Sequence, residues 1–308
     1  MRILVIKLSA LGDVVLGFGP FAAIRAHHPG AQITLLTTPP FAELARRSPW
    51  FDAVWENGRP RGLGALWQLA RQLRGGGFHR VYDLQTSSRS SRYRWLVGGR
   101  AEWSGIAAGA SHPHRNPDRD AMHTIERQRE QLEQAGITYF PLPELGWLDA
   151  ALGHLVLPDR FTLLVPGASP QRPAKRWPEF PALAAMLPGP VAVAGGASER
   201  NLAAAILRAR PDAVDLTGRT SLFELGAVAR RARATVGNDT GPTHLAAAVG
   251  CPTLALFGED SDPRLAAPRG TTVRLLRREP LSALSPAEVM TALRDLDAGR
   301  AGSPSPSP

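Results

Sequence analysis

The sequence predicts an α/β protein with two parallel sheets, and three observations carry this prediction. Short apolar runs alternate with longer helix-like segments, which is the pattern of strands joined by crossover helices. The alternation comes in two series of similar length, separated by a proline-rich stretch at residues 141–158. Polar clusters follow strands in both series, at the sheet edge where open α/β sheets bind their ligands.

The composition fits a globular protein with room for two domains. The chain has 308 residues, 44% of them hydrophobic, and no apolar run reaches the roughly 20 residues that span a bilayer. A strand pattern starts within the first residues, so we expect no signal peptide. The single cysteine, Cys251, forms no intrachain disulfide, which fits a cytoplasmic location.

The formal net charge is +9, mostly from arginine. Such a charge favours an anionic partner: nucleic acid, an anionic membrane surface or a phosphorylated substrate. An arginine-rich proteome would explain the same charge. Because the sequence has neither an RNA-binding aromatic signature nor zinc-finger spacing, we expect no nucleic-acid partner.

The first series predicts an N-terminal Rossmann-like domain over residues 1–157. Two of its loops, at residues 8–13 and 85–92, follow strands and carry polar side chains. The strands are predicted at residues 2–7, 33–37, 53–55 and 80–84, and the helices at residues 14–27, 39–46, 63–73 and 123–135.

Asp13 is the candidate functional residue of the first loop. Gly12 allows a close backbone approach, and Asp13 follows the first strand at the ligand edge. A helix N-cap is an equally good interpretation of Asp13. No G-x-G-x-x-G follows this strand, so a nicotinamide oxidoreductase is disfavoured.

The loop after the strand at residues 80–84 is rich in hydroxyls and arginine. It contains Gln85, Arg89 and Arg92, and it suits a polar or anionic acceptor. A solvated loop without a ligand is the alternative.

The second series predicts a C-terminal Rossmann-like domain over residues 158–298, followed by a disordered tail at residues 299–308, which is too polar and proline-rich to fold. Strands are predicted at residues 161–165, 191–194, 214–216, 234–236, 253–257 and 273–276. Two helices are predicted to start at residues 179 and 198, and two further helices are predicted to end at residues 229 and 250. A last helix is predicted over residues 285–296.

The turn at residues 239–244 is the strongest candidate site. The N–H groups of Thr240 and Gly241 would point outward at a helix N-terminus, where an anion is favoured, and His244 would add a donor. Asp239 would repel phosphate and is better suited to accept hydrogen bonds from sugar hydroxyls. The turn therefore suits a sugar and a phosphate together. An ordinary strand-to-helix connection, with Asp239 as cap and a packed His244, is the alternative.

Two further groups of the second series follow strands. Lys175 precedes a helix and would clamp phosphates together with Arg176. Glu199 lies in the first turn of the next helix and faces the same edge, although a carboxylate also simply stabilises a helix start.

Two Asp-x-Asp strings raise the question of a metal on a diphosphate. Asp118 and Asp120 lie in an irregular stretch, whereas Asp260 and Asp262 follow a strand. Metal-dependent transferases use such pairs. We expect no required metal.

Four motifs, in this order and spacing, resemble glycosyltransferase family 9, the ADP-heptose:lipopolysaccharide heptosyltransferases, over the whole chain except the tail. The resemblance implies a GT-B fold: two Rossmann-like domains facing a central cleft, with the acceptor on the first and ADP-heptose on the second. It also implies inversion by a single displacement, without metal or other cofactor. The motifs are residues 7–14, 83–85, 166–178 and 239–246.

The resemblance also implies roles for individual residues. Asp13 matches the proposed catalytic base, Lys175 a phosphate ligand that supports catalysis, and Glu199 a ribose ligand. The remaining donor contacts would be Asp239, Thr240, Gly241 and His244, with Ser169 and Thr220 as looser matches. On the acceptor side we expect Ser9, Gly12, Gln85, Arg89 and Arg92.

The predicted function is therefore heptosyltransferase II-like transfer of heptose from ADP-heptose to a lipopolysaccharide core. The anionic glycolipid acceptor implies a cytoplasmic enzyme with peripheral contact at the inner membrane. Family 9 also contains transferases for other glycan or protein acceptors, and a GT-B nucleotide-sugar epimerase is a further alternative.

Overall fold

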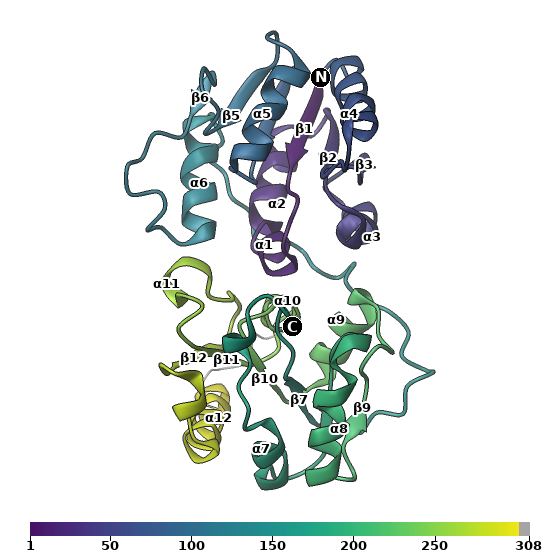
Figure 1. Cartoon of the computed structure of the whole chain (residues 1–308), viewed down its shortest axis with the longest axis vertical. Coiled ribbons are helices and arrows are strands. Elements are labelled where there is room, and N and C mark those ends of the chain that lie inside the picture. Colours follow the sequence, from purple (N-terminus) through teal and green to yellow (C-terminus); the bar gives the residue numbers. More distant parts are fainter. Residues whose placement is uncertain (302–308) are drawn as a thin grey trace. The chain divides into compact units, whose positions relative to one another are not determined.

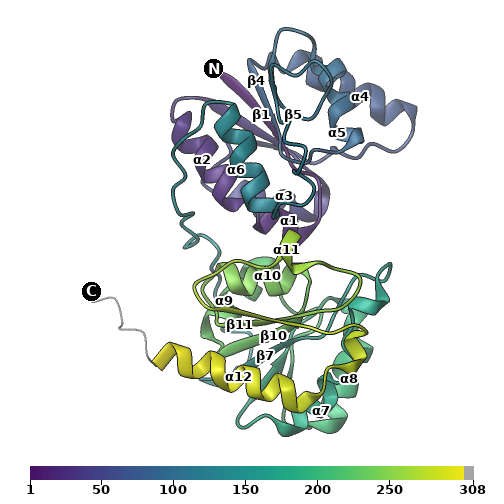
Figure 2. The ribbon, with the colours of Figure 1, turned by 90° about the vertical axis from the view of Figure 1, so that its left-hand side faces the viewer.

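The computed structural model describes residues 1–301, with side chains placed as far as Leu296. Its internal contacts divide the chain into two compact units, Met1–Trp147 and Leu148–Pro308, shown in Figure 1 and, turned by 90°, in Figure 2. The division falls inside the proline-rich stretch at residues 141–158. The domain limits 1–157 and 158–298 stay a prediction, and the tail predicted at residues 299–308 lies outside the described residues from residue 302 onward.

The N-terminal unit is a six-stranded parallel sheet in the order β3-β2-β1-β4-β5-β6. Its strands are β1 Arg2–Ile6, β2 Gln32–Leu36, β3 Ala53–Trp55, β4 Arg80–Asp83, β5 Glu102–Gly105 and β6 His112–Pro113. Its helices are α1 Leu11–Val15, α2 Phe18–His27, α3 Pro39–Arg47, α4 Leu63–Gly75, α5 Ser88–Val97 and α6 Thr124–Gln134.

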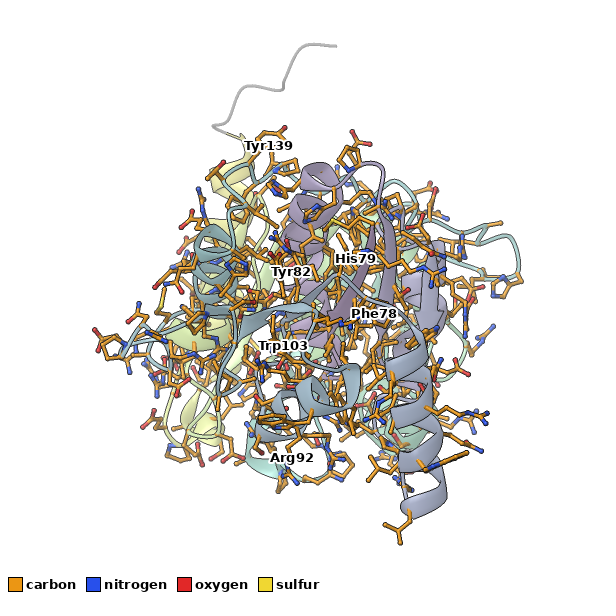
Figure 3. The ribbon with its side chains drawn as sticks, turned by 90° about the horizontal axis from the view of Figure 1, so that it is seen from above. Phe78, His79, Tyr82, Arg92, Trp103 and Tyr139 are labelled. Carbon is orange, nitrogen blue, oxygen red and sulfur yellow. The ribbon has the colours of Figure 1, made fainter. Side chains whose placement is uncertain are left out.

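Helices cover both faces of this sheet. On one face α4 and α5 lie side by side, and Leu69, Leu73 and Tyr93 pack against Leu4 and Val81 of the central strands. On the other face α2 packs against α6. Figure 3 looks down on the unit, with the strands between these two helical layers. Such a doubly wound sheet leaves its carboxyl edge free for loops that bind ligands.

Two predictions for this unit are wrong in detail. The helix predicted at residues 14–27 is two helices, α1 and α2, because Pro20 has no N–H for the carbonyl of Leu16. Asp13 therefore lies inside a helix instead of before one. The loop predicted at residues 85–92 ends early, because Ser87 caps α5 by accepting a hydrogen bond from the Ser90 N–H.

The C-terminal unit repeats the topology in the order β12-β11-β10-β7-β8-β9. Its strands are β7 Thr162–Val165, β8 Val191–Val193, β9 Val214–Asp215, β10 Ala234–Asn238, β11 Thr253–Phe257 and β12 Val273–Arg277. Its α-helices are α7 Phe180–Met186, α8 Arg200–Ala209, α9 Leu222–Arg231, α10 Gly241–Ala248, α11 Pro263–Ala266 and α12 Pro286–Ala301, and 3-10 turns lie at η1 Pro173–Lys175, η2 Ala197–Glu199 and η3 Leu281–Ala283.

The core of this unit lies between the central strands and helices α7, α8 and α12. Leu164, Val236 and Leu254 come from three adjacent strands, and Trp177 and Phe180 pack with them. Ser221 caps α9 and Glu224 completes the capping box. None of the helices within residues 1–301 is long and apolar enough to cross a membrane.

Candidate functional site

Several of the predicted site residues lie where each sheet reverses its winding direction. In the N-terminal unit the reversal lies between β1 and β4, and in the C-terminal unit between β7 and β10. Parallel sheets bind ligands outside the carboxyl ends of the strands at such points. Asp13 and Gln85 follow β1 and β4, whereas Lys175 and Asp239 follow β7 and β10.

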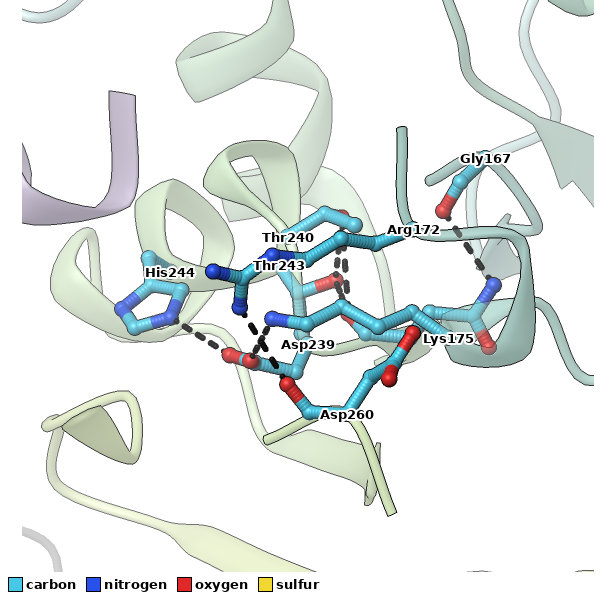
Figure 4. A network of polar contacts seen from close by, with 9 residues as sticks. Gly167, Arg172, Lys175, Asp239, Thr240, Thr243, His244 and Asp260 are labelled. Atoms are coloured by element: carbon cyan, nitrogen blue, oxygen red, sulfur yellow. Dashed lines mark hydrogen bonds and ion pairs between the residues drawn. The ribbon is translucent and has the colours of Figure 1, made fainter. Parts of the chain in front are cut away.

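Asp239 is the centre of a buried charged cluster in the C-terminal unit. Its Oδ2 accepts a hydrogen bond from Lys175 Nζ at 2.6 Å, and its Oδ1 lies 3.1 Å from His244 Nε2. All three side chains are at most 13% exposed. Figure 4 shows Lys175 and His244 converging on Asp239 from opposite sides. Residues separated by more than sixty positions in the sequence are therefore joined in one cluster.

The cluster has a defined charge arrangement. Burial opposes ionisation of Asp239, but hydrogen bonds from His244 and Lys175 hold the pKa of that carboxyl below its ordinary value. Because an ionised carboxylate only accepts hydrogen bonds, His244 Nε2 must be the donor. The other ring nitrogen, Nδ1, is buried without a hydrogen-bond partner among the described residues. Buried polar atoms of this kind usually meet a water molecule or a ligand.

The start of α10 leaves backbone donors available beside this cluster. Thr240 is the N-cap residue, yet its side chain makes no capping hydrogen bond. Thr243 also turns inward, where its hydroxyl donates to the Asn238 carbonyl at 2.7 Å. Gly237 permits this packing, because a Cβ there would collide with the Thr243 hydroxyl. The free N–H groups and the helix dipole together suit an anion.

Asn238 holds the two loops of the site together, and sequence analysis missed this role. Its amide Nδ2 donates to the carbonyls of Pro166 and Gly167 at 2.8 and 3.1 Å, and its Oδ1 accepts from the Trp177 N–H at 3.2 Å. The side chain is completely buried. An asparagine ending a buried strand was the available signal, but its partners become visible only in the fold.

Glu199 belongs to the same edge, in the 3-10 turn η2 that follows β8, the strand next to β7. Its Oε2 accepts from the Gly196 N–H at 2.7 Å, and its carboxylate lies so close to Gly167 that a Cβ there would overlap it. Ser169 is exposed and donates to Gln171 Oε1 at 2.6 Å. Thr220 follows the edge strand β9, and two strands, β7 and β8, lie between β9 and β10, so the structure does not bring Thr220 into the Asp239 cluster.

Side-chain oxygens of Asp13 and Gln85 accept hydrogen bonds from the backbone N–H groups of the Asp13 loop. Asp13 Oδ2 accepts a hydrogen bond from the Ala10 N–H at 2.9 Å. Gln85 Oε1 accepts from the N–H groups of Leu8 and Ser9 at 2.8 and 3.2 Å. Gln85 therefore braces the loop that carries Ser9 and Asp13, a contact that its predicted role as an acceptor ligand did not anticipate.

Charged groups lie beneath this loop. Lys7 is buried and its Nζ donates to the Leu84 carbonyl at 3.2 Å. Burial lowers the pKa of Lys7, the charge of Asp13 opposes this shift, and Arg127 reinforces it. Burial also raises the pKa of Asp83 to about 6. Lys7 and Arg127 therefore both interact electrostatically with Asp13.

Arg89 and Arg92 stand on α5 and not in a loop. Both side chains are exposed, and Arg92 Nε donates to the Ser88 carbonyl at 3.1 Å. Figure 3 shows Arg92 on the side of α5 that faces away from the strands. The structure gives neither arginine a contact with the Asp13 loop.

One carboxylate of each Asp-x-Asp string forms an ion pair with arginine. Asp262 caps α11, and hydrogen bonds from Arg264 lower its pKa to about 2. Asp120 pairs with Arg119 at 2.6 Å. Among the described residues, no group of three His, Cys, Asp or Glu side chains is placed to hold a metal ion.

Two Rossmann-like units, each with polar residues at the reversal point of its sheet, form a GT-B fold. The structure resembles that of ADP-heptose lipopolysaccharide heptosyltransferase II from E. coli, with a TM-score of 0.80, 23% identity and coverage of 98% of this chain and 100% of the other. This likeness shows the fold.

Sequence comparison identifies the family. Residues 66–285 match Glycosyltransferase family 9 (heptosyltransferase). The chain is 31% identical to Lipopolysaccharide heptosyltransferase 1 of Pseudomonas aeruginosa, over 84% of this chain and 79% of that protein. It is 29% identical to Lipopolysaccharide heptosyltransferase 2 of Escherichia coli, over 90% and 88%. The chain belongs to glycosyltransferase family 9 and is a glycosyltransferase.

Proposed function

We propose that this enzyme transfers a heptose from ADP-heptose to a lipopolysaccharide core acceptor with inversion, as a heptosyltransferase II-like enzyme. Family membership and the names of two curated relatives, Lipopolysaccharide heptosyltransferase 1 and Lipopolysaccharide heptosyltransferase 2, support the heptose transfer. The observation that carries it is the Lys175–Asp239–His244 cluster beside the open N-terminus of α10, because one small region offers partners for both a sugar and a diphosphate.

The donor is held by complementary groups in this proposal. Lys175 uses one ammonium proton on Asp239 and keeps two for phosphate oxygens, next to the N–H groups of Thr240 and Gly241. His244 offers its unpartnered Nδ1 to the sugar. Glu199 binds the ribose hydroxyls, and Ser169 and Thr220 are peripheral candidates.

The transfer step needs one base and a stabilised leaving group. Asp13 takes the proton of the acceptor hydroxyl as its oxygen bonds to the anomeric carbon of the heptose. The bond from that carbon to the diphosphate oxygen breaks, and its electron pair leaves on ADP. Lys175 and the start of α10 stabilise the developing negative charge. We propose that no metal or other cofactor takes part.

The acceptor side is proposed from the loops after β1 and β4. Ser9, Gly12 and Gln85 line the Asp13 loop, and Arg89 and Arg92 supply charge for an anionic glycolipid. Such an acceptor resides in a membrane, so the proposed location is the cytoplasm with peripheral contact at the inner membrane face.

Calorimetry and a transfer assay in EDTA test the proposal together. ADP-heptose should bind in preference to GDP- and UDP-sugars, and transfer to a lipopolysaccharide core acceptor should proceed without added metal. Binding that needs a divalent ion would refute the metal-free mechanism, and failure to bind ADP-sugars would refute the donor. An epimerase would instead convert its nucleotide-sugar without any acceptor, and product analysis in acceptor-free reactions separates the two.

A further inference from the structure

Large apolar side chains stand uncovered on α4 and α5 of the N-terminal unit. Leu63 is 86% exposed, Trp67 is 62% exposed and Trp95 is 68% exposed. Leu63 and Trp67 are four residues apart on α4, so they share one face, whereas Leu69 and Leu73 of the same helix are fully buried against the sheet. The helix therefore has a second apolar surface that nothing in its own unit covers.

The segment that contains both helices is strongly basic. Between residues 57 and 101 the chain has nine arginines and one acidic residue, Asp83, which is fully buried. Seven of these arginines are exposed, and none of them forms an ion pair with any carboxylate among the described residues. They are Arg59, Arg61, Arg71, Arg74, Arg89, Arg92 and Arg100.

Arginine and tryptophan are interleaved on both helices. The Arg71 guanidinium lies 4.9 Å from the ring centre of Trp67, and that of Arg94 lies 5.4 Å from Trp95. Because α4 and α5 pack side by side, the pairs belong to one continuous layer of the unit. Tryptophan prefers the boundary between headgroups and acyl chains, and a guanidinium can stay with the headgroups above it.

We propose that this α4–α5 surface docks on an anionic phospholipid bilayer. Charge complementarity selects this occupant: the exposed arginines on α4 and α5, which have no carboxylate partner among the described residues, favour dense negative charge, and Leu63 and Trp67 favour an apolar layer directly beneath it. Nucleic acid would satisfy the arginines and leave the leucine without a partner. Docking would place the start of α4, which follows the ligand edge of the sheet, at the lipid headgroups.

Vesicle co-sedimentation tests this proposal with the full-length enzyme. Vesicles of phosphatidylcholine alone are compared with vesicles that also contain phosphatidylglycerol, in the absence of any glycolipid acceptor. We expect binding to the anionic vesicles only, weakening as salt rises. Trp67→Glu combined with Trp95→Glu should weaken binding at least about tenfold, and Arg71→Gln combined with Arg74→Gln by a similar factor.

A matched control uses exposed apolar residues elsewhere in the same unit. Tyr139 and Leu142 are 69% and 92% exposed, and Tyr139→Glu with Leu142→Glu should bind vesicles like the wild type. Thermal melting of each variant checks that it folds. Equal binding to neutral and anionic vesicles, or wild-type binding by the Trp67→Glu/Trp95→Glu enzyme, would overturn the proposal.

Fluorescence separates direct contact from an indirect effect. Trp67→Phe with Trp95→Phe keeps two apolar rings, so it should retain binding but lose the quenching by brominated lipids that the wild type shows. Unchanged quenching would overturn the proposal. Light scattering that shows a dimer in the wild type and a monomer in the glutamate variant, without vesicle binding, would assign the surface to a second copy.

The inference goes beyond the proposed transfer reaction and can fail independently of it. Transfer to a water-soluble acceptor fragment should be unchanged in the Trp67→Glu/Trp95→Glu enzyme. Loss of vesicle binding with intact transfer thus isolates the docking surface, and vesicle binding by a chain that transfers no heptose would contradict the proposed function alone.

Discussion

Asp13 and Asp239 both lie beside the reversal point of their sheets, Asp13 after the first strand of its unit and Asp239 after the fourth, and their surroundings differ sharply. Each follows a strand beside the reversal point of its sheet. Asp239 is buried and held by the side chains of Lys175 and His244. Asp13 is only partly buried and is held by one backbone N–H. The first environment keeps a carboxylate charged and fixed, whereas the second leaves a carboxylate accessible to exchange a proton. This difference is consistent with the proposed binding role of Asp239 and the proposed base role of Asp13.

The largest expected effect comes from removing the proposed base. Asp13→Asn keeps the shape and the hydrogen bond to the Ala10 N–H but cannot accept the acceptor proton. We expect kcat to fall by about 10²–10⁴-fold, with the dissociation constant of ADP-heptose unchanged in calorimetry. A kcat within about threefold of wild type would contradict the proposed base role of Asp13.

Removing the other carboxylate should act on stability and donor binding instead. Asp239→Ala leaves Lys175 buried without its partner, which typically costs about 3–5 kcal/mol. Denaturant unfolding should show the lower stability, and calorimetry should show weaker donor binding. The expected effect on kcat with saturating donor is smaller than for Asp13→Asn, and the reverse order would contradict the assigned roles.

Asp83 provides a pH test within the N-terminal unit. Its pKa is raised by burial to about 6 in the folded chain. Its contribution to stability is therefore fully present below about pH 4 and is lost as pH rises through about 6, a change of about 3 kcal/mol. Asp83→Asn should weaken the dependence of the melting temperature on pH between pH 4 and pH 6. A wild-type pH profile in that variant would disprove the assignment.

Asp239 should show the opposite sign in the same pH series. Its pKa is lowered in the folded chain, so its contribution is present above about pH 4 and is lost only as pH falls further. Melting temperatures of Asp83→Asn and wild type between pH 3 and pH 7 therefore distinguish the two buried carboxylates, because the substitution removes only the contribution of Asp83.

Lys175→Gln tests the phosphate contact with a modest expected effect. A neutral amide can still reach Asp239 but has no charge for the diphosphate. We expect donor affinity to fall about 10–100-fold, with a weaker dependence on salt than in the wild type. Arg172→Gln is a control, because Arg172 is exposed and donates to the backbone carbonyl of Asp260. Equal losses of donor affinity in both variants would mean that the overall positive charge of this region, and not the specific Lys175 contact, binds the donor.

The smallest effect is expected from Gln85, which we place as a positioning residue. Gln85→Ala removes the acceptor for the Leu8 and Ser9 N–H groups, which should lower kcat about tenfold through a looser Asp13 loop. Gln85→Glu keeps an acceptor oxygen and should restore most of kcat. A change confined to the KM of the acceptor, without rescue, would instead favour direct acceptor binding.

Much of the fold could be predicted from local pattern. The buried strand at residues 253–257 and the short strand at residues 53–55 match the structure, because apolar runs between turn signals leave little freedom. The break at Gly17 and the start of α5 were missed. Residues 88–97 are rich in hydroxyl and arginine side chains, so their sequence pattern did not indicate a helix. In the structure the Ser87 cap and the buried side chain of Tyr93 stabilise this helix.

The candidate site was predictable in its residues but not in its connections. Asp239 and Lys175 stood out by residue type and position, yet nothing local indicates that they touch each other. Asn238 and Gln85 act through backbone groups far away in sequence, and those partners are set by strand order. Contacts of this kind depend on which strands become neighbours, which one sequence does not display directly.

Gly167 has a consequence for how this enzyme tolerates change. A side chain there would meet the flexible carboxylate of Glu199, and the backbone need not move. Gly167→Ala would therefore survive any screen for folding while displacing the group proposed to hold the ribose. Tolerance measured by expression and tolerance measured by catalysis would disagree at this position. A library selected only for solubility would accumulate inactive enzymes that carry this substitution.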